Sequence, residues 1–177
     1  MPISESELLS RMAGVKAVVL DADGVLTDGR LIVGQDGQEM QVFDVRDGFG
    51  IRALLMSGIR VALISGRRSE AVRLRCEYLG VSDVFQDVQR KAALFDSLVV
   101  KYGINPAETC YVGDDINDIA VLKHAGLSVC VRDACEELKS LCHMVTSRRG
   151  GRGAIREVAQ GILRAQGKWD GVLGRFA

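Results

Sequence analysis

Two aspartates, Asp21 and Asp23, directly follow the short apolar run at residues 15–20 and precede Gly24. Alternate side chains of extended backbone share a face, so the two carboxylates should lie on the same side of the chain. Two like charges this close repel each other unless a cation or a shared proton lies between them. The pair is therefore suited to holding a cation or to acid–base chemistry, although an isolated Asp-x-Asp-Gly is equally typical of a solvated acidic turn.

A second acidic group follows another apolar run, at residues 109–112, and consists of Asp114, Asp115 and Asp118. Asp118 comes four residues after Asp114, which is one turn of a helix. Helix capping would explain one of these aspartates, but not all three together with the first pair. Mg²⁺ takes one or two carboxylates and fills its remaining positions with water and phosphate oxygens. We therefore expect a Mg²⁺ site where the two strands end.

Three further residues could bind the phosphate that such a metal accompanies. Ser65 and Gly66 follow the apolar run at residues 60–64 and begin a helix, where a hydroxyl and backbone amides can receive phosphate. Lys91 opens a later helix and adds a cation. Each feature is weak alone, because a Ser-Gly pair also caps helices and a single lysine usually lies on the surface.

Short β-branched runs alternate along the chain with stretches of helix length. This alternation predicts right-handed βαβ units and an α/β fold, namely a three-layer, doubly wound parallel sheet. Ligands of such sheets bind at the carboxyl ends of the strands, where the candidate residues fall. A capping-box pattern at Ser4 and Glu7 predicts an additional N-terminal helix. We expect strands at residues 15–20, 60–64, 109–112, 127–131 and 143–145, and helices near 47–57, 69–79, 91–102, 117–124, 135–141 and 154–165.

One segment, residues 29–45, interrupts the alternation of strands and helices. Apolar residues alternate with polar ones on both sides of a Gln-Asp-Gly-Gln turn, which predicts a projecting β-hairpin. A lone hairpin is marginally stable in water, so its apolar side chains need a partner. We expect this hairpin to be an oligomerisation element, and the protein to be a homo-oligomer, most simply a homotetramer.

No linker divides the chain, so residues 1–177 are expected to form a single domain. Only 25 residues separate Ser65 from Lys91, which leaves no room there for a cap domain over the site. We therefore expect a neighbouring subunit to close the active site. The segment at residues 150–153 is the candidate for that role, because its glycines allow close approach and Arg152 carries a charge.

The composition is that of an ordinary soluble globular protein, with 47% hydrophobic and 26% charged residues. Its 23 basic and 23 acidic residues balance, so the chain lacks the net positive charge that drives binding to nucleic acid or to an anionic membrane. No apolar stretch is long enough for a signal peptide or a membrane span. We predict a cytoplasmic protein. Its five cysteines are an odd number and lack the paired spacing of a zinc site, so we expect them to be reduced thiols, most of them buried.

Taken in order, these elements resemble the haloacid dehalogenase-like phosphatase superfamily, whose pattern is D-x-D-G, then S or T, then K, then G-D-D-x-x-D. The resemblance covers about residues 15–163. It implies that Asp21 is the nucleophile that forms an aspartyl-phosphate. It also implies that Asp23 protonates the leaving alcohol and then activates water. Mg²⁺ would be held by Asp21, Asp114 and the backbone carbonyl of Asp23.

The same resemblance gives roles to the remaining polar residues. Ser65 and Lys91 would bind the transferring phosphoryl oxygens, and Lys91 would also neutralise Asp21. Asp115 and Asp118 would orient the metal ligands without binding the metal themselves. The charges suit this chemistry, because attack by a carboxylate on a dianionic phosphate needs positive charge near both partners.

Finer features resemble the family of phosphatases that hydrolyse 3-deoxy-D-manno-octulosonate 8-phosphate (KDO 8-phosphate) in lipopolysaccharide precursor synthesis. They are the segments at residues 21–29, 45–48, 64–67 and 150–154, together with the hairpin. Ala22 stands where that family commonly has valine. The substrate would be a sugar acid, whose carboxylate a guanidinium can bind in a bidentate manner. The substrate-binding residues expected from this resemblance are Arg46, Gly48, Gly66, Arg67 and Arg152.

Three alternatives are open at this point. Phosphatases of nonulosonate 9-phosphates share much of the pattern. A non-catalytic binding module would keep the fold, but it should lack Asp21 or Asp23. A receiver domain should carry its phospho-acceptor aspartate after the third strand, where this chain has Ser65 and Gly66.

Overall fold

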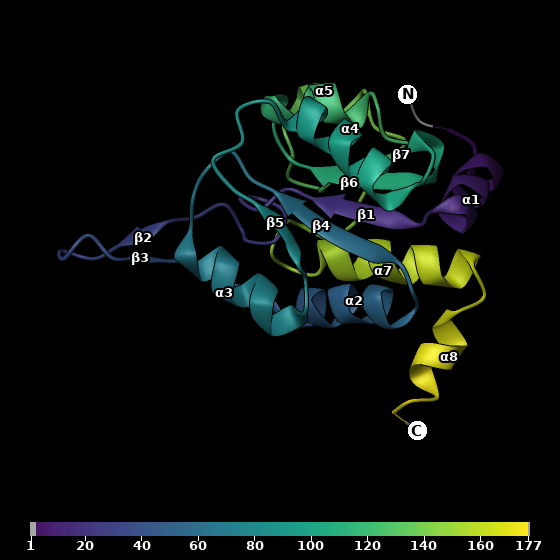
Figure 1. Ribbon diagram of the computed structural model, residues 1–177, viewed down its shortest axis with the longest axis horizontal. Coiled ribbons are helices and arrows are strands. Elements are labelled where there is room, and N and C mark those ends of the chain that lie inside the picture. The colour runs from purple at the N-terminus through teal and green to yellow at the C-terminus, as the bar shows by residue number, and fades with distance from the viewer. Residues whose placement is uncertain (1–2, 177) are drawn as a thin grey trace.

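Six parallel strands form the central sheet of the computed structural model, which describes residues 3–176 (Figure 1). Their order is β5-β4-β1-β6-β7-β8, so the chain builds outward from β1 in one direction, crosses over, and then builds in the other. The predicted doubly wound α/β fold is confirmed. The strands are β1 (Ala17–Leu20), β4 (Arg60–Ile64), β5 (Asp83–Phe85), β6 (Thr109–Gly113), β7 (Leu127–Cys130) and β8 (Met144–Val145).

The register of the three central strands decides where the functional residues meet. Leu20 at the end of β1 pairs with Leu63 of β4 on one side and with Val112 of β6 on the other. The three strands therefore end at the same level, and their next residues emerge at one edge of the sheet. All four residues of β1 are buried, as expected for a strand covered on both faces.

Helices cover both faces of the sheet, which gives the predicted three layers (Figure 1). The helices α2 (Val45–Met56), α3 (Glu70–Leu79) and α7 (Ala154–Ala165) lie on one face, and α4 (Lys91–Tyr102) and α5 (Ile119–Leu122) lie on the other. Helix α1 (Glu5–Gly14) packs against α7 and begins at Ser4, whose side chain accepts from the Glu7 amide as the capping-box pattern predicts. The remaining short helices are η1 (Pro106–Glu108), η2 (Ile116–Asp118), α6 (Glu136–Lys139) and α8 (Trp169–Leu173).

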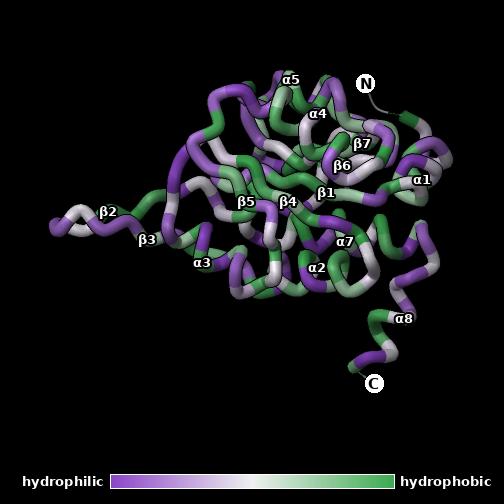
Figure 2. The backbone as a smooth tube through the Cα atoms, viewed as in Figure 1, coloured by the Kyte–Doolittle hydropathy of each residue, from purple (hydrophilic) through white to green (hydrophobic). Residues whose placement is uncertain are grey.

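The predicted hairpin forms a separate two-stranded sheet that projects from the body of the molecule (Figure 1). Its strands, β2 (Ile32–Val33) and β3 (Glu39–Met40), are antiparallel, and a bridge between Thr27 and Phe43 closes its base. The colouring by hydropathy in Figure 2 shows apolar segments along this extension. Several apolar side chains of the hairpin are exposed: Leu31, Ile32, Val33, Met40 and Val42.

Two predictions made from composition can be compared with the described residues. All five cysteines are unpaired and four of them are buried, as expected for reduced thiols in a core. Among the helices of residues 3–176, none combines the length and apolar character needed to cross a membrane.

Candidate active site

A cleft of about 450 Å³ lies at the carboxyl ends of β1, β4 and β6. The sheet register brings segments that are far apart in the sequence to this one edge. The lining includes the four residues predicted to be catalytic and also several predicted to bind metal or substrate. Those lining residues are Asp21, Asp23, Ser65, Gly66, Arg67, Lys91, Asp114 and Asp115.

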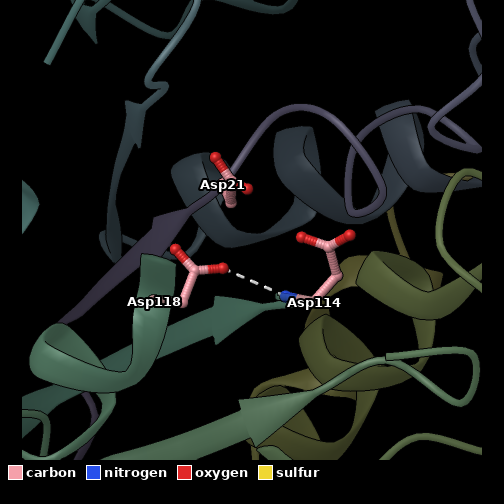
Figure 3. Close-up of side chains that lie close together, drawn as sticks. All are labelled: Asp21, Asp114 and Asp118. Carbon is pink, nitrogen blue, oxygen red and sulfur yellow. Dashed lines mark hydrogen bonds between the residues drawn. The ribbon is translucent and has the colours of Figure 1, made fainter. Parts of the chain in front are cut away.

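Three carboxylates lie close together at this edge of the sheet, and two of them, Asp21 and Asp114, line the cleft (Figure 3). Asp21, Asp114 and Asp118 each place one oxygen within 4.8 Å of the others. Asp118 is fully buried and is held by β6, since its Oδ1 accepts from the Tyr111 hydroxyl at 2.7 Å and its Oδ2 from the Asp114 amide at 3.1 Å. Gly24 leaves space for this arrangement, because a Cβ there would collide with the Asp114 carboxylate. The backbone of Gly24 is also left-handed, with φ of 84°, which favours glycine.

Lys91 is the cation of this cluster, and it lies inside the protein rather than on the surface. The side chain is 4% exposed, and its Nζ lies 2.8 Å from Asp21 Oδ1 and 2.8 Å from Asp118 Oδ1. Burial acts to lower the pKa of Lys91, but the two carboxylates outweigh it and raise the pKa above the ordinary value. The ammonium group therefore stays charged and holds the nucleophile candidate against the buried Asp118.

One ammonium does not balance three carboxylates. Burial, reinforced by Asp118, raises the pKa of Asp21 to about 6. Burial, reinforced by Asp21 and Asp118, raises the pKa of Asp114 to about 8. Both shifts record an excess of negative charge in a place with little solvent. A hard divalent cation with oxygen ligands fits this donor set, so these residues suit Mg²⁺.

Asp23 lies at the rim of the cleft and is held by two neighbours. Arg67 donates from Nε to Oδ2 at 3.2 Å and from Nη2 to Oδ1 at 3.0 Å. Gln41, from the hairpin, donates to Oδ1 at 2.7 Å. Arg67 also pairs with Glu39 on β3. Asp23 is thus bound to groups outside the buried cluster and can act separately from Asp21.

Ser65 directly follows β4 and begins the turn that leads to α3. It is buried, and its Oγ donates to the Arg67 carbonyl at 2.9 Å while accepting from the Arg67 amide at 3.2 Å. Gly66 has nothing closer than 3.9 Å to the position of a Cβ, so its backbone faces open space. This turn places a hydroxyl and a glycine backbone in the cleft that Lys91 also lines, which suits the binding of phosphoryl oxygens.

A protein-family model described as haloacid dehalogenase-like hydrolase matches residues 80–156. The 3-deoxy-D-manno-octulosonate 8-phosphate phosphatase KdsC of Escherichia coli K12 is 42% identical to this chain over 174 residues, which cover 98% of the chain and 92% of the relative. The chain belongs to the KDO 8-phosphate phosphatase family. Both resemblances drawn from the sequence, to the superfamily and to this family, are therefore confirmed.

Solved structures of the same family superimpose on nearly the whole chain. The KDO 8-phosphate phosphatase of Yersinia pestis has a TM-score of 0.92 at 40% identity, and the match covers 93% of this chain and 89% of that one. The KDO 8-phosphate phosphatase of Moraxella catarrhalis has a TM-score of 0.95 at 35% identity, and the match covers 98% of this chain and 100% of that one. The Moraxella structure is a complex with magnesium, phosphate and KDO.

Three residues predicted to bind substrate lie outside the cleft of this family member. Arg46 pairs with Asp44 at 2.6 Å and lines a different cavity, of about 460 Å³, beside α7. Arg152 pairs with Asp28 at 3.0 Å. Gly48 is a packing residue, because a Cβ there would collide with the Arg75 side chain on α3. The larger cavity near Arg46 lacks the carboxylate cluster, so we place the chemistry in the cleft.

The segment at residues 150–153, expected to close the site of a neighbouring chain, packs within its own chain at Gly150 and Gly151. Both glycines are buried against the chain's own loop after β1. The Gly151 amide donates to the Val25 carbonyl at 2.9 Å, and a Cβ on Gly150 would collide with the Gly24 carbonyl. The glycines allow close backbone approach as predicted, but the backbone they approach belongs to the same chain.

Sequence reasoning missed three residues that shape the site of this phosphatase family member and one buried aspartate that joins two helices beside it. Gln41 reaches Asp23, and Ser69 in turn donates to Gln41. Tyr111 donates from its hydroxyl to Asp118, and it was missed because it lies within a run of residues that was interpreted only as an apolar strand. Asp47 is fully buried and accepts from the Gly153 and Arg156 amides, both at 2.9 Å, which ties α2 to the start of α7. Only Asp47 carried a signal in the sequence, as an aspartate within the first turn of a predicted helix.

Proposed function

We propose that this protein is a Mg²⁺-dependent phosphomonoesterase that hydrolyses KDO 8-phosphate to KDO and phosphate. The observation that carries the proposal is the buried cluster of Asp21, Asp114, Asp118 and Lys91 at the sheet edge. Such a cluster combines a nucleophile, an incomplete cation site and a fixed ammonium group. A family member in which magnesium, phosphate and KDO are bound together supports the assignment of substrate.

The reaction consists of two displacements on phosphorus. A carboxylate oxygen of Asp21 attacks the phosphorus, the bond from phosphorus to the sugar oxygen breaks, and Asp23 gives its proton to that oxygen. Water then attacks the aspartyl-phosphate, Asp23 takes a proton from the water, and phosphate leaves with Asp21 restored. A poor alkoxide leaving group needs this proton, which is why a second carboxyl group beside the nucleophile is required.

We infer that Asp21, Asp114 and the backbone carbonyl of Asp23 hold the Mg²⁺ ion. When bound, the ion supplies positive charge that offsets the negative charge of both nucleophile and phosphate. Asp118 keeps Lys91 beside Asp21 and fixes the Asp114 backbone. Asp115 caps η2, accepting from the Ile116 amide at 2.8 Å, and so shapes the loop that carries Asp114.

Lys91, Ser65 and Gly66 are the groups we assign to the phosphoryl oxygens. The ammonium group of Lys91 already touches Asp21, so it can neutralise charge on the nucleophile and on phosphate at once. We assign the carboxylate of the sugar acid to Arg67. It alone among the three predicted arginines lines the cleft, and guanidinium binds carboxylate in a bidentate manner.

We also propose that the protein is a homotetramer in which a neighbouring subunit completes the cleft. Support comes from the hairpin, where the side chains of Ile32, Val33, Met40 and Val42 are 50–62% exposed. Pairing with hairpins of other subunits would bury these side chains and cover the free strand edges. Light scattering at micromolar concentration tests this, and a monomeric mass would contradict it. A location in the cytoplasm stays a prediction from sequence.

The activity is tested by measuring phosphate release from KDO 8-phosphate, a nonulosonate 9-phosphate and 4-nitrophenyl phosphate, with Mg²⁺ and with EDTA. We expect kcat/KM to be highest for KDO 8-phosphate and activity to be absent in EDTA. A preference for the nonulosonate phosphate would assign the alternative substrate. Absence of Mg²⁺-dependent release from all three would contradict the phosphatase assignment itself.

A further inference from the structure

The carboxylate of Asp23 is held by two side chains, and one of them belongs to the projecting hairpin. Gln41 comes directly after β3, and its Nε2 donates to Asp23 Oδ1 at 2.7 Å. Arg67, the second neighbour, donates to both oxygens from the turn after β4. The hairpin therefore contributes a contact to the group assigned to proton transfer, in addition to any role in assembly.

The orientation of the Gln41 amide is determined by its other neighbour. Ser69 Oγ donates its only proton to Gln41 Oε1, which turns the amide nitrogen toward Asp23. Ser69 is itself fixed, because Gln86 bonds both its amide and its carbonyl, at 2.8 and 2.9 Å. A flipped amide would place Oε1 against the carboxylate, where both groups are acceptors, and would lose the hydrogen bond to Asp23. The chain from Gln86 through Ser69 to Gln41 thus holds a single donor on Asp23.

Gln41 and Arg67 engage the two carboxylate oxygens of Asp23 differently. Oδ1 accepts from both Gln41 and Arg67, which engages both of its lone pairs, whereas Oδ2 accepts only from Arg67 Nε, at 3.2 Å, and keeps one lone pair free for a proton. Gln41 engages Oδ1 alone. A carboxyl group whose Oδ1 accepts from an amide carries its proton on Oδ2. Oδ2 would therefore be the oxygen that delivers the proton.

We propose that Gln41 is a positioning residue for Asp23: it fixes Oδ1 so that Oδ2 faces the leaving oxygen. This inference rests on the proposed phosphatase reaction. As the Asp21–phosphorus bond forms and the phosphorus–oxygen ester bond breaks, the proton passes from Oδ2 to the departing oxygen. Losing the Gln41 contact frees a lone pair on Oδ1, so the proton is no longer confined to Oδ2, which slows only steps that need the proton.

The test compares substrates whose leaving groups need the proton to different extents. Glycerol 2-phosphate has a poor alkoxide leaving group, whereas 4-nitrophenyl phosphate has a good one. The measured quantity is kcat/KM, which reports steps up to the first irreversible bond cleavage. For Gln41→Ala we expect a loss of about 10-fold with glycerol 2-phosphate, the worth of one oriented hydrogen bond to a charged group, and of less than about 2-fold with 4-nitrophenyl phosphate.

Two further variants separate positioning from packing. Gln41→Glu keeps the size of the side chain but cannot donate to Asp23, so it should show the same selective loss. Gln38→Ala removes an exposed glutamine from the same hairpin and should leave both values unchanged. Light scattering on each variant should give the wild-type mass. An equal loss with both substrates, or wild-type values for Gln41→Glu, would overturn the proposal.

The outcomes also distinguish this proposal from the proposed function. If the wild-type protein hydrolyses both generic phosphates but not KDO 8-phosphate, the substrate assignment fails while the comparison of Gln41 variants still decides the positioning role. If the wild-type protein hydrolyses no phosphate in Mg²⁺, both proposals fall together.

Discussion

Replacing Lys91 with methionine isolates the electrostatic part of the active site. Lys91→Met keeps most of the side-chain volume but removes the ammonium group that lies 2.8 Å from both Asp21 and Asp118. Two buried carboxylates then lose their partner. Removing one member of a buried ion pair destabilises proteins by about 3–5 kcal/mol, so we expect a loss of that size in the free energy of unfolding without Mg²⁺.

Urea denaturation in EDTA at pH 8 and at fixed protein concentration measures this loss. Lys16→Met is the matched control, because Lys16 also pairs with a carboxylate, Glu108, but is 61% exposed. We expect the control to lose at most about 1 kcal/mol. Mg²⁺ should stabilise Lys91→Met more than the wild type, since the variant carries one more uncompensated negative charge.

The loss in Lys91→Met should also shrink as the pH falls, because protonation of Asp21 removes one of the charges that Lys91 neutralises. A loss no larger than that of Lys16→Met would refute the reasoning. It would mean that the buried carboxylates are neutral or solvated, and that Lys91 does not stabilise them. Turnover of 4-nitrophenyl phosphate by Lys91→Met should fall in parallel, since the same ammonium group is assigned to the phosphoryl oxygens.

Three further predictions follow from the same cleft. Asp21→Asn should abolish Mg²⁺-dependent phosphate release while circular dichroism shows an intact fold, and wild-type turnover would exclude Asp21 as nucleophile. The raised pKa values of Asp21 and Asp114 mean that, above pH 3.8, the folded chain keeps protons on these groups that the unfolded chain has lost. The free energy of unfolding measured in EDTA should therefore fall as the pH rises toward 8. Bound Mg²⁺ should abolish that decline. Gly24→Ala should weaken Mg²⁺ binding measured by calorimetry at least 10-fold, since its Cβ would displace the Asp114 carboxylate; unchanged affinity would mean that Asp114 is not a ligand.

Sequence reasoning predicted the features of the site that depend on local pattern and on the rules of parallel sheets. Asp21, Ser65 and Asp114 each follow an apolar run, and strands that end at one level must bring such residues together. The hairpin was also predictable, because its alternation and turn residues are local. Strand β5 was missed because it has only three residues, all half-buried, at the edge of the sheet.

Contacts that depend on where one element lies relative to another could not be predicted. Gln41 reaches Asp23 only because the base of the hairpin lies over the turn after β4, and no local pattern encodes that position. The arginines show the same limit. Arg46 binds its near neighbour Asp44, whereas Arg152 binds Asp28 from the opposite part of the chain. Residue type suggested a carboxylate partner for each, and in the structure each of the two pairs with an aspartate of its own chain.

Two carboxylates in this fold, Asp47 and Asp114, show how a structural charge differs from a functional one. Asp47 is fully buried, and burial raises its pKa, but two backbone amides at 2.9 Å satisfy its oxygens and no cation site is left over. Asp114 is partly buried beside two further carboxylates, and the only ammonium group of the cluster is engaged by Asp21 and Asp118. The first arrangement stabilises the junction of α2 and α7. The second leaves negative charge uncompensated, and that imbalance, which destabilises the metal-free chain, is what drives binding of a divalent cation at the nucleophile.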